Sequence, residues 1–293
     1  MTALSMCAAG FTAWLLALRW TAIAAPQVTT GRIRAAVQRH PRLAATVESR
    51  LDPSVTTGLA LTAASAIVVV GVVGFGLLLL MVRTNIGFAH FDQAAARFAG
   101  RHAGAASTSV LRYLTQLGGA VVLVPVTAVV AMVAVWRYRS ASVVVFLLFV
   151  VGGQFAVADL IKWIVDRGRP NIDRLTGFSG PSFPSGHAVA AAATFGAFAL
   201  LAGIGRPARA KAALAAAAVA LAVGIACTRL FLGVHWLTDV LAGLALGWAW
   251  FALCSIGFGG RLLNFGAPVK QAQEAAEAAE DRRATVSPSS SRS

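Results

Sequence analysis

Residues 58–82, GLALTAASAIVVVGVVGFGLLLLMV, contain no charged side chain. About 20 consecutive apolar residues suffice for a helix to cross the hydrocarbon core of a bilayer, so this segment is long enough to span a membrane. The chain lacks the alternation of apolar and polar residues that is typical of transmembrane barrel strands. We therefore predict an all-α fold, a polytopic membrane helical bundle with six transmembrane helices. The other five apolar stretches lie at about 109–136, 141–161, 187–204, 211–228 and 236–258.

The composition excludes a soluble globular domain, because 58% of the residues are hydrophobic and only 12% are charged. The formal net charge of +14 is of the kind that nucleic-acid-binding proteins carry. Membrane proteins, however, collect Lys and Arg in their cytoplasmic loops, so we expect no nucleic-acid partner. The three cysteines, Cys7, Cys227 and Cys254, are far apart without metal-ligand spacing, and we interpret them as packing residues.

Three regions follow from this pattern. Residues 1–57 form an N-terminal hydrophobic and basic extension, 58–258 a six-span core, and 259–293 a cytoplasmic, largely disordered tail after a short Ala/Glu helix. The apolar segment 3–18 is short for a span, and we interpret it as an interfacial or marginal seventh segment. The alternative is a cleaved signal peptide, which would invert the topology of the core.

With six spans, the loops after the second and fourth spans lie on the same side of the membrane. Both are short and basic, which by the positive-inside rule places them in the cytoplasm. We therefore expect a multi-pass plasma-membrane protein whose opposite, extracytoplasmic face carries the long loop 162–187 and the turn 228–239. The basic residues of the two cytoplasmic loops are Arg137, Arg139, Arg206, Arg209 and Lys211.

Lys162 and Arg169-Pro170, separated by six residues, form the first candidate motif. An Arg fork and a mobile Lys charge together suit a phosphoryl group. The alternative is that both side chains snorkel to the membrane surface.

Pro184-Ser185-Gly186-His187 precedes an apolar run and predicts the N-terminus of a helix, where unpaired N–H groups attract an anion. Ser185 is a candidate N-cap, and Gly186 allows a ligand to approach the backbone closely. His187 could give a proton to a leaving oxygen. The alternative is a plain cap followed by a hydrated histidine.

Arg229, His235 and Asp239 form the third motif, with five and then three residues between them. If this segment is helical, His235 and Asp239 share a face at i and i+4, so the carboxylate can fix the tautomer of the imidazole. Asp239 also lies in an otherwise uncharged span, where a carboxylate is costly unless it has a partner. The alternative is an interfacial histidine and an unrelated acid.

Together the three motifs resemble the signature of the type 2 phosphatidic acid phosphatase superfamily, which includes the lipid phosphate phosphatases and relatives similar to acid phosphatases and vanadium haloperoxidases. The match runs over residues 162–239, and Thr228 stands where the family has Ser, which keeps the hydroxyl.

The resemblance implies a role for each matched residue. His235 is expected to be the nucleophile that forms a phosphohistidine, oriented by Asp239, with His187 as the acid. It implies no metal and no other cofactor. The residues expected to hold the phosphoryl oxygens are Lys162, Arg169, Ser185, Gly186 and Arg229.

The expected activity is hydrolysis of a membrane-borne lipid phosphate or diphosphate, either phosphatidate-like or a polyprenyl diphosphate such as undecaprenyl diphosphate. A phosphotransferase of the same superfamily is an alternative, because water and an alcohol compete for one phosphohistidine. From other classes, an anion or lipid transporter and an inactive lipid-binding relative remain open. The expected partners are a lipid phosphate substrate and membrane lipid, and the sequence carries no signal for an oligomeric state.

Overall fold

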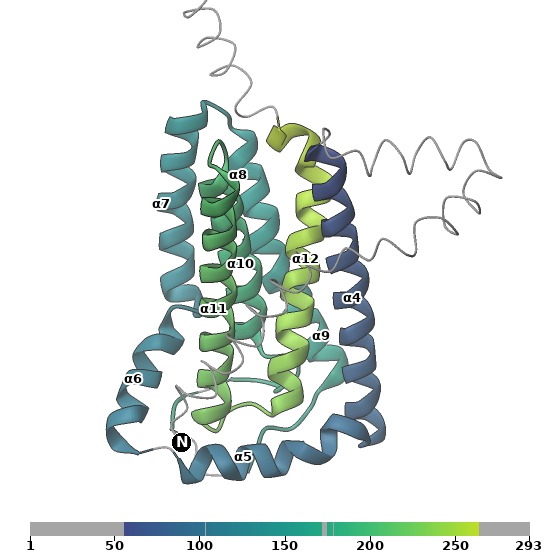
Figure 1. Ribbon diagram of the computed structural model, residues 1–293. Coiled ribbons are helices and arrows are strands. Elements are labelled where there is room, and N and C mark those ends of the chain that lie inside the picture. Colours follow the sequence, from purple (N-terminus) through teal and green to yellow (C-terminus); the bar gives the residue numbers. More distant parts are fainter. Residues whose placement is uncertain (1–55, 103, 172–174, 178, 264–293) are drawn as a thin grey trace, which may run out of the picture.

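The computed structural model describes residues 56–102, 104–171, 175–177 and 179–263. Within these ranges, six helical segments are long and apolar enough to cross a membrane, which confirms the predicted six-span helical bundle (Figure 1). The N-terminal segment 3–18 and most of the tail lie outside the described residues. The spanning segments are α4 (Thr56–Thr84), α7 (Ala120–Tyr138), α8 (Ser142–Leu147) continued by the π-helical turn η2 (Leu148–Gly152) and α9 (Gly153–Val165), α10 (Gly186–Gly203), α11 (Ala208–Phe231) and α12 (Leu237–Leu263).

The second span differs from the prediction, which began it at residue 109. The chain turns at Leu117–Gly119 and divides the region into α6 (Ala105–Gln116) and α7. A Cβ atom at Gly118 would lie 2.5 Å from Ile225 Cγ2, so the turn packs against α11 more closely than other residues allow. The first eight residues of the predicted span therefore belong to a separate helix.

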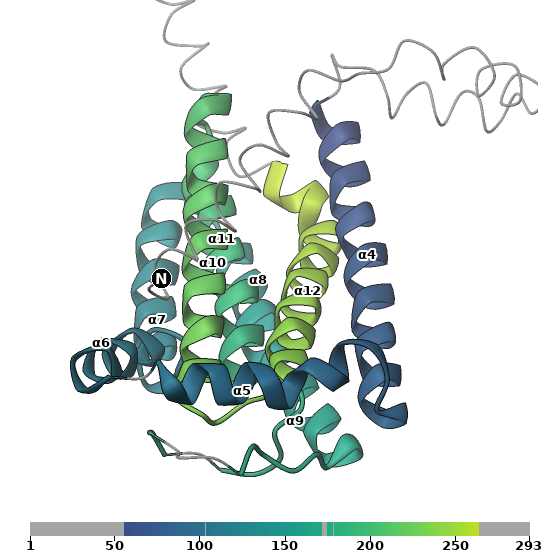
Figure 2. The ribbon, with the colours of Figure 1, turned by 60° about the horizontal axis from the view of Figure 1, so that its bottom comes forward.

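Three short helices lie at the end of the bundle where α10 and α12 begin, and one of them, α5, runs across it (Figures 1 and 2). They are η1 (Gly87–Phe91), α5 (Asp92–Arg101) and α6. On α5 the buried residues are Asp92, Ala96 and Ala99, whose spacing of four and three positions puts them on one helix face. The other face of α5 is exposed, so α5 is an amphipathic helix that closes this end.

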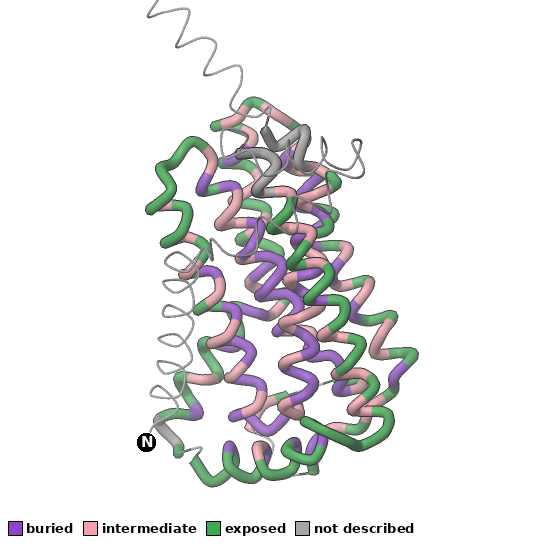
Figure 3. The backbone as a smooth tube through the Cα atoms, turned by 45° about the vertical axis from the view of Figure 1, so that its right-hand side comes forward, coloured by how far each residue is buried: buried purple, intermediate pink, exposed green. Residues whose placement is uncertain are grey.

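Helix α10 is the centre of the bundle. Of the 18 residues of α10, 61% are buried, compared with 11% of the 18 most apolar consecutive residues of α4. Figure 3 shows that buried residues are concentrated in the interior of the bundle. Many of its residues are alanines, which let neighbouring helices approach closely. The exposed apolar residues Val69, Val70, Val72 and Val73 lie on α4, as expected for a lipid-facing helix.

Two glycines bring α12 against α10. A Cβ atom at Gly243 would lie 2.7 Å from the Ser185 carbonyl oxygen, and one at Gly247 would lie 2.5 Å from that of Val189. Glycines four residues apart on a membrane helix allow backbones to pack directly against each other. This contact fixes the start of α12 beside the start of α10.

Candidate active site

The three sequence motifs meet at the end of the bundle that α5 and α6 cover. The first spans the end of α9 and the following loop, the second begins α10, and the third joins α11 to α12. The Ser185 N–H donates to the Asp239 carbonyl oxygen at 3.0 Å, which ties the second motif to the third. Residues from four spans therefore converge on one site.

His235 lies in the turn before α12 and not on a helix, which corrects the prediction from sequence. The turn is made possible by Gly233, whose φ of +71° is unfavourable for other residues. Asp239 is in the first turn of α12, and its Oδ2 atom lies 3.5 Å from His235 Nδ1. The same Oδ2 atom accepts the Trp236 N–H at 3.0 Å. The pair is therefore brought together by a helix N-terminus and not by a shared helix face.

His235 is only 3% exposed. Burial lowers its pKa below the ordinary histidine value of 6.5, although Asp239 opposes the shift. The imidazole is therefore neutral at neutral pH, the form in which one ring nitrogen is available as a nucleophile.

Arg169 defines the tautomer of His235. Its guanidinium donates to the carbonyl oxygen of Val234 at 2.7 Å, and Nη1 also lies 3.3 Å from His235 Nε2. A guanidinium can only donate, so Nε2 is the acceptor and Nδ1 carries the proton toward Asp239. Three further hydrogen bonds anchor Arg169 on the carbonyl oxygens of Ser179, Gly180 and Pro181.

The N-terminus of α10 presents a cation and an unpartnered hydroxyl. Ser185 occupies the N-cap position as predicted, but its side chain makes no capping hydrogen bond, and its buried Oγ atom has no partner. Lys162 Nζ lies 3.2 Å from the position of a Cβ atom at Gly186, so any larger residue there would crowd the ammonium group. Lys162 also forms an ion pair with Asp159 at 3.0 Å.

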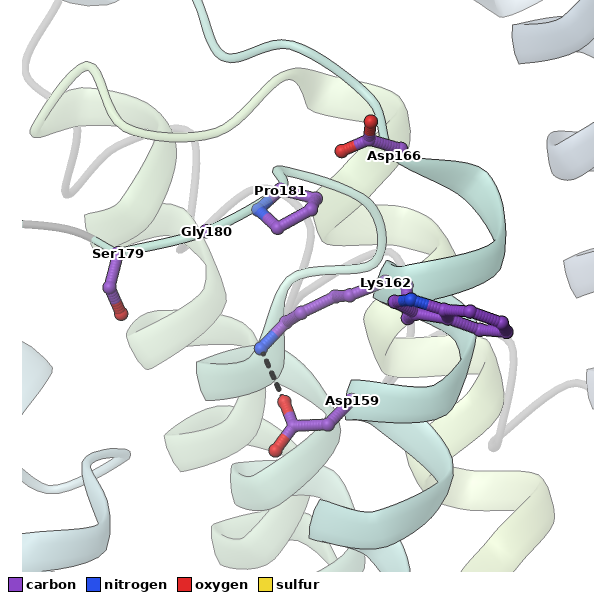
Figure 4. Close-up of a pocket in the computed structure, with 7 residues that line it drawn as sticks. Asp159, Lys162, Asp166, Ser179, Gly180 and Pro181 are labelled. Carbon is purple, nitrogen blue, oxygen red and sulfur yellow. Dashed lines mark hydrogen bonds and ion pairs between the residues drawn. The ribbon is translucent and has the colours of Figure 1, made fainter.

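A cavity of about 490 Å³ opens beside Lys162, between α9 and the loop that holds Arg169 (Figure 4). Trp163 lines it and is exposed on the outer surface of α9. The cavity therefore lies between the Lys162 ammonium group and the exposed surface of α9. Its other lining residues are Asp159, Asp166, Ser179, Gly180 and Pro181.

Arg229 and His187 lie beside α6 and the turn that follows it. Arg229 is 4% exposed and donates through Nη1 to Thr115 Oγ1 of α6 at 3.0 Å, while its buried Nε atom has no partner. His187 faces the turn between α6 and α7, with Nε2 3.6 Å from a Cβ atom placed at Gly119.

This arrangement suits a tetrahedral oxyanion. Ser185 Oγ and Arg229 Nε are buried and have no partner, and a buried donor without a partner is costly unless a ligand satisfies it. Among the described residues, no group of three or more His, Cys, Asp or Glu side chains is arranged to hold a metal ion.

Sequence reasoning missed three polar residues at this end. Asp92 and Arg167 are ion-paired at 2.7 Å, and Thr115 holds Arg229. Arg167 lies inside the first motif, and this position could have indicated that it belongs to the site. Asp92 and Thr115 come from the short helices, whose contacts with the motifs depend on the tertiary fold.

The fold and site define a class: a polytopic helical membrane protein with paired histidines and several cations at one end of its bundle. A family model described as the PAP2 superfamily matches residues 143–261. Phosphatidylglycerophosphatase B of Bacillus subtilis (strain 168) is 30% identical over 158 residues, which are 53% of this chain and 77% of that protein. The chain belongs to the PAP2 superfamily.

Two further matches are to phosphatases. A lipid A 1-phosphatase of Rhizobium johnstonii is 38% identical over 118 residues, which are 37% of this chain and 44% of that protein. The crystal structure of a transmembrane PAP2-type phosphatidylglycerolphosphate phosphatase from Bacillus subtilis superposes with a TM-score of 0.62 at 28% identity, covering 66% of this chain and 96% of that one. The relatives thus support a phosphatase that crosses the membrane several times.

Proposed function

We propose that this protein hydrolyses a lipid phosphate or diphosphate through a phosphohistidine on His235. The observation that carries the proposal is the neutral, buried imidazole whose Nε2 atom faces Arg169 Nη1 at 3.3 Å. The unpartnered Ser185 Oγ and Arg229 Nε atoms support it, because a phosphoryl oxygen would satisfy both.

The reaction proceeds in two displacements at phosphorus. His235 Nε2 attacks, the bond to the leaving oxygen breaks, and protonated His187 gives that oxygen a proton and becomes neutral. Water then attacks the phosphohistidine while His187 takes a proton from it, which releases inorganic phosphate and restores both histidines. Asp239, whose Oδ2 atom lies 3.5 Å from Nδ1, orients the His235 ring throughout.

The phosphoryl oxygens are held by protein groups alone in this proposal. Preorganised cations and N–H donors stabilise the charge that metal ions stabilise in many other phosphoryl-transfer enzymes. The residues proposed to bind these oxygens are Lys162, Arg169, Arg229, the Ser185 hydroxyl and the Gly186 backbone.

The substrate is proposed to be a lipid that reaches Lys162 from the bilayer. The exposed Leu160, Trp163 and Ile164 on α9 provide an apolar surface for the lipid tail. The names of the relatives favour phosphatidylglycerophosphate and a lipid A 1-phosphate. A phosphatidate-like lipid and a polyprenyl diphosphate such as undecaprenyl diphosphate are the other substrate classes proposed. We place the enzyme in the plasma membrane with its site on the extracytoplasmic face.

The test is phosphate release by purified protein from phosphatidylglycerophosphate, phosphatidate, undecaprenyl diphosphate and a lipid A 1-phosphate. The wild type should release phosphate from at least one of them, and His235→Ala should abolish release while remaining folded. The exposed Gln93 on α5 provides a control, Gln93→Ala, which should keep full activity. Wild-type turnover by His235→Ala would refute the phosphohistidine, and transfer to added glycerol in preference to water would identify a phosphotransferase.

A further inference from the structure

Asp92, which no sequence motif includes, makes three polar contacts with Thr238, at the N-terminus of α12, and with Arg167. Although it belongs to α5, its carboxylate is 2% exposed. Its Oδ1 atom accepts the Thr238 N–H at 2.9 Å, and its Oδ2 atom accepts the Thr238 hydroxyl at 2.6 Å. The same Oδ2 atom accepts Arg167 Nη2 at 2.7 Å, also as an ion pair. A buried carboxylate at a helix N-terminus is well stabilised, so this connection between α5 and α12 is rigid.

Arg167 bridges two buried carboxylates. Its Nη2 atom binds Asp92, while Nη1 donates to Asp239 Oδ1 at 2.6 Å and to Thr238 Oγ1 at 2.7 Å. The guanidinium also lies over the Trp236 ring, 5.5 Å from its centroid. Both of its terminal nitrogens are thus engaged by side chains of the protein.

Arg167 and Arg169 are separated by one residue and serve opposite sides of the same segment. The segment is anchored through its backbone, because Ser182 donates to the Arg167 and Gly168 carbonyl oxygens at 2.8 and 2.9 Å. From this support Arg169 reaches Nε2 of His235, and Arg167 reaches the carboxylate that faces Nδ1. The two arginines therefore enclose the His235–Asp239 pair from both ends.

The consequence for Asp239 is a fixed orientation. Arg167 holds Oδ1 and the Trp236 N–H holds Oδ2, so Oδ2 is the oxygen that faces His235. Without Arg167 the carboxylate could rotate about its terminal torsion, which is soft, and the imidazole would lose its preferred tautomer.

We propose that Asp92 and Arg167 are positioning residues of the phosphatase reaction, acting through Asp239 on the tautomer and orientation of His235. This inference rests on the proposed function and extends it to a helix outside the family's motifs. It links α5, the amphipathic helix that closes the end of the bundle, to the nucleophile.

The test compares Asp92→Asn, Arg167→Gln and Arg167→Lys, each alone and combined with Asp239→Asn, and Gln93→Ala is the control. By analogy with partners that orient histidine ligands in metal sites, Asp92→Asn and Arg167→Gln should lower kcat by about 10- to 100-fold. KM should change little because neither residue touches substrate. Arg167→Lys should recover part of the loss, since it retains a cation beside Asp239.

The double variants separate positioning from a general structural role. If Arg167 acts through Asp239, Arg167→Gln should cost little more once Asp239→Asn is present, because the two changes remove one interaction. If the losses in kcat of the two single variants multiply in the double variant, or if only KM changes, the proposal is overturned. Thermal unfolding of each variant identifies any loss caused by misfolding, and a variant with unchanged kcat would overturn the proposal equally.

Vanadate binding, measured by the shift in unfolding temperature that vanadate causes, tests the positioning proposal separately from the substrate proposal. If no lipid phosphate is turned over but the wild type binds vanadate more tightly than Asp92→Asn and Arg167→Gln, the positioning proposal stands and the substrate proposal fails. Equal vanadate affinity in all variants would overturn the positioning proposal alone. A wild type that neither hydrolyses lipid phosphates nor binds vanadate would overturn both.

Discussion

The Ser185 carbonyl oxygen lies 2.7 Å from the position that a Cβ atom at Gly243 would occupy. A hydrogen atom is therefore the largest side chain that this contact admits. Because Ser185 begins the α10 motif and Gly243 lies one turn beyond Asp239, the distance between the two proposed catalytic histidines depends on this packing.

Gly243→Ala should therefore separate α10 from α12 and disturb both stability and activity. Overpacking of this kind costs typically about 1–3 kcal/mol. A displacement approaching 1 Å at the reacting groups can lower the rate by about 100-fold. Phosphate release and thermal unfolding measure the two effects. The control is Gly257→Ala on the same helix, where an added Cβ meets nothing within 4 Å, and equal behaviour of the two variants would contradict the argument.

Arg169→Lys should lower kcat/KM by about 10²–10³, the usual cost of losing an oxyanion contact. A lysine cannot replace the guanidinium that holds Val234 and the loop carbonyls while facing His235 Nε2. Steady-state kinetics of phosphate release measures the effect. Arg97→Lys, on the exposed face of α5, should leave the kinetics unchanged. An Arg169→Lys enzyme as active as the Arg97→Lys control would show that only the charge matters.

Activity should persist in EDTA and be inhibited by vanadate. Vanadate can adopt five-coordinate geometry on His235 among the cations that are proposed to bind phosphate. The measurement is phosphate release after dialysis against chelator, with and without added vanadate. Loss of activity in EDTA that Mg²⁺ restores would instead indicate a metal-dependent hydrolase.

Thr194→Val should raise the stability of the protein in detergent. Thr194 is fully buried in α10 and its hydroxyl has no hydrogen-bond partner, whereas valine has nearly the same shape without the polar group. Removing such a buried unsatisfied group should stabilise the fold by about 1 kcal/mol. Thr228→Val is the matched comparison and should not stabilise, because the Thr228 hydroxyl donates to the Ile225 carbonyl oxygen at 2.6 Å. A lower unfolding temperature for Thr194→Val would reveal a polar partner at that hydroxyl.

The final prediction concerns which side of the membrane carries the site. Ser107 on α6 lies at the site end, Ala208 begins α11 at the other end, and both are exposed. In a background without native cysteines, Ser107→Cys should react with an impermeant thiol reagent outside intact cells. Ala208→Cys should react only after permeabilisation. The reverse pattern would place the site in the cytoplasm, as a cleaved signal peptide would require.

Hydropathy alone was sufficient to determine the six spans, because burial in a bilayer is a local property of each apolar segment. The break before α7 was missed, since a glycine pair in an apolar run marks a turn only when α11 packs against it. Helices α5 and α6 were missed as well. Helix α5 lies between the first two predicted spans, and α6 overlaps the start of the second predicted span.

At the site, the sequence determined which chemical groups are available, and the tertiary structure decided what each one contacts. The spacing of His235 and Asp239 predicted their proximity, but the turn at Gly233 and the start of α12 bring it about. Asp92 and Arg167 are 75 residues apart and meet only because α5 folds across the end of the bundle. Side-chain partners at such separations depend on how the helices pack, and here that packing rests on glycine contacts between backbones.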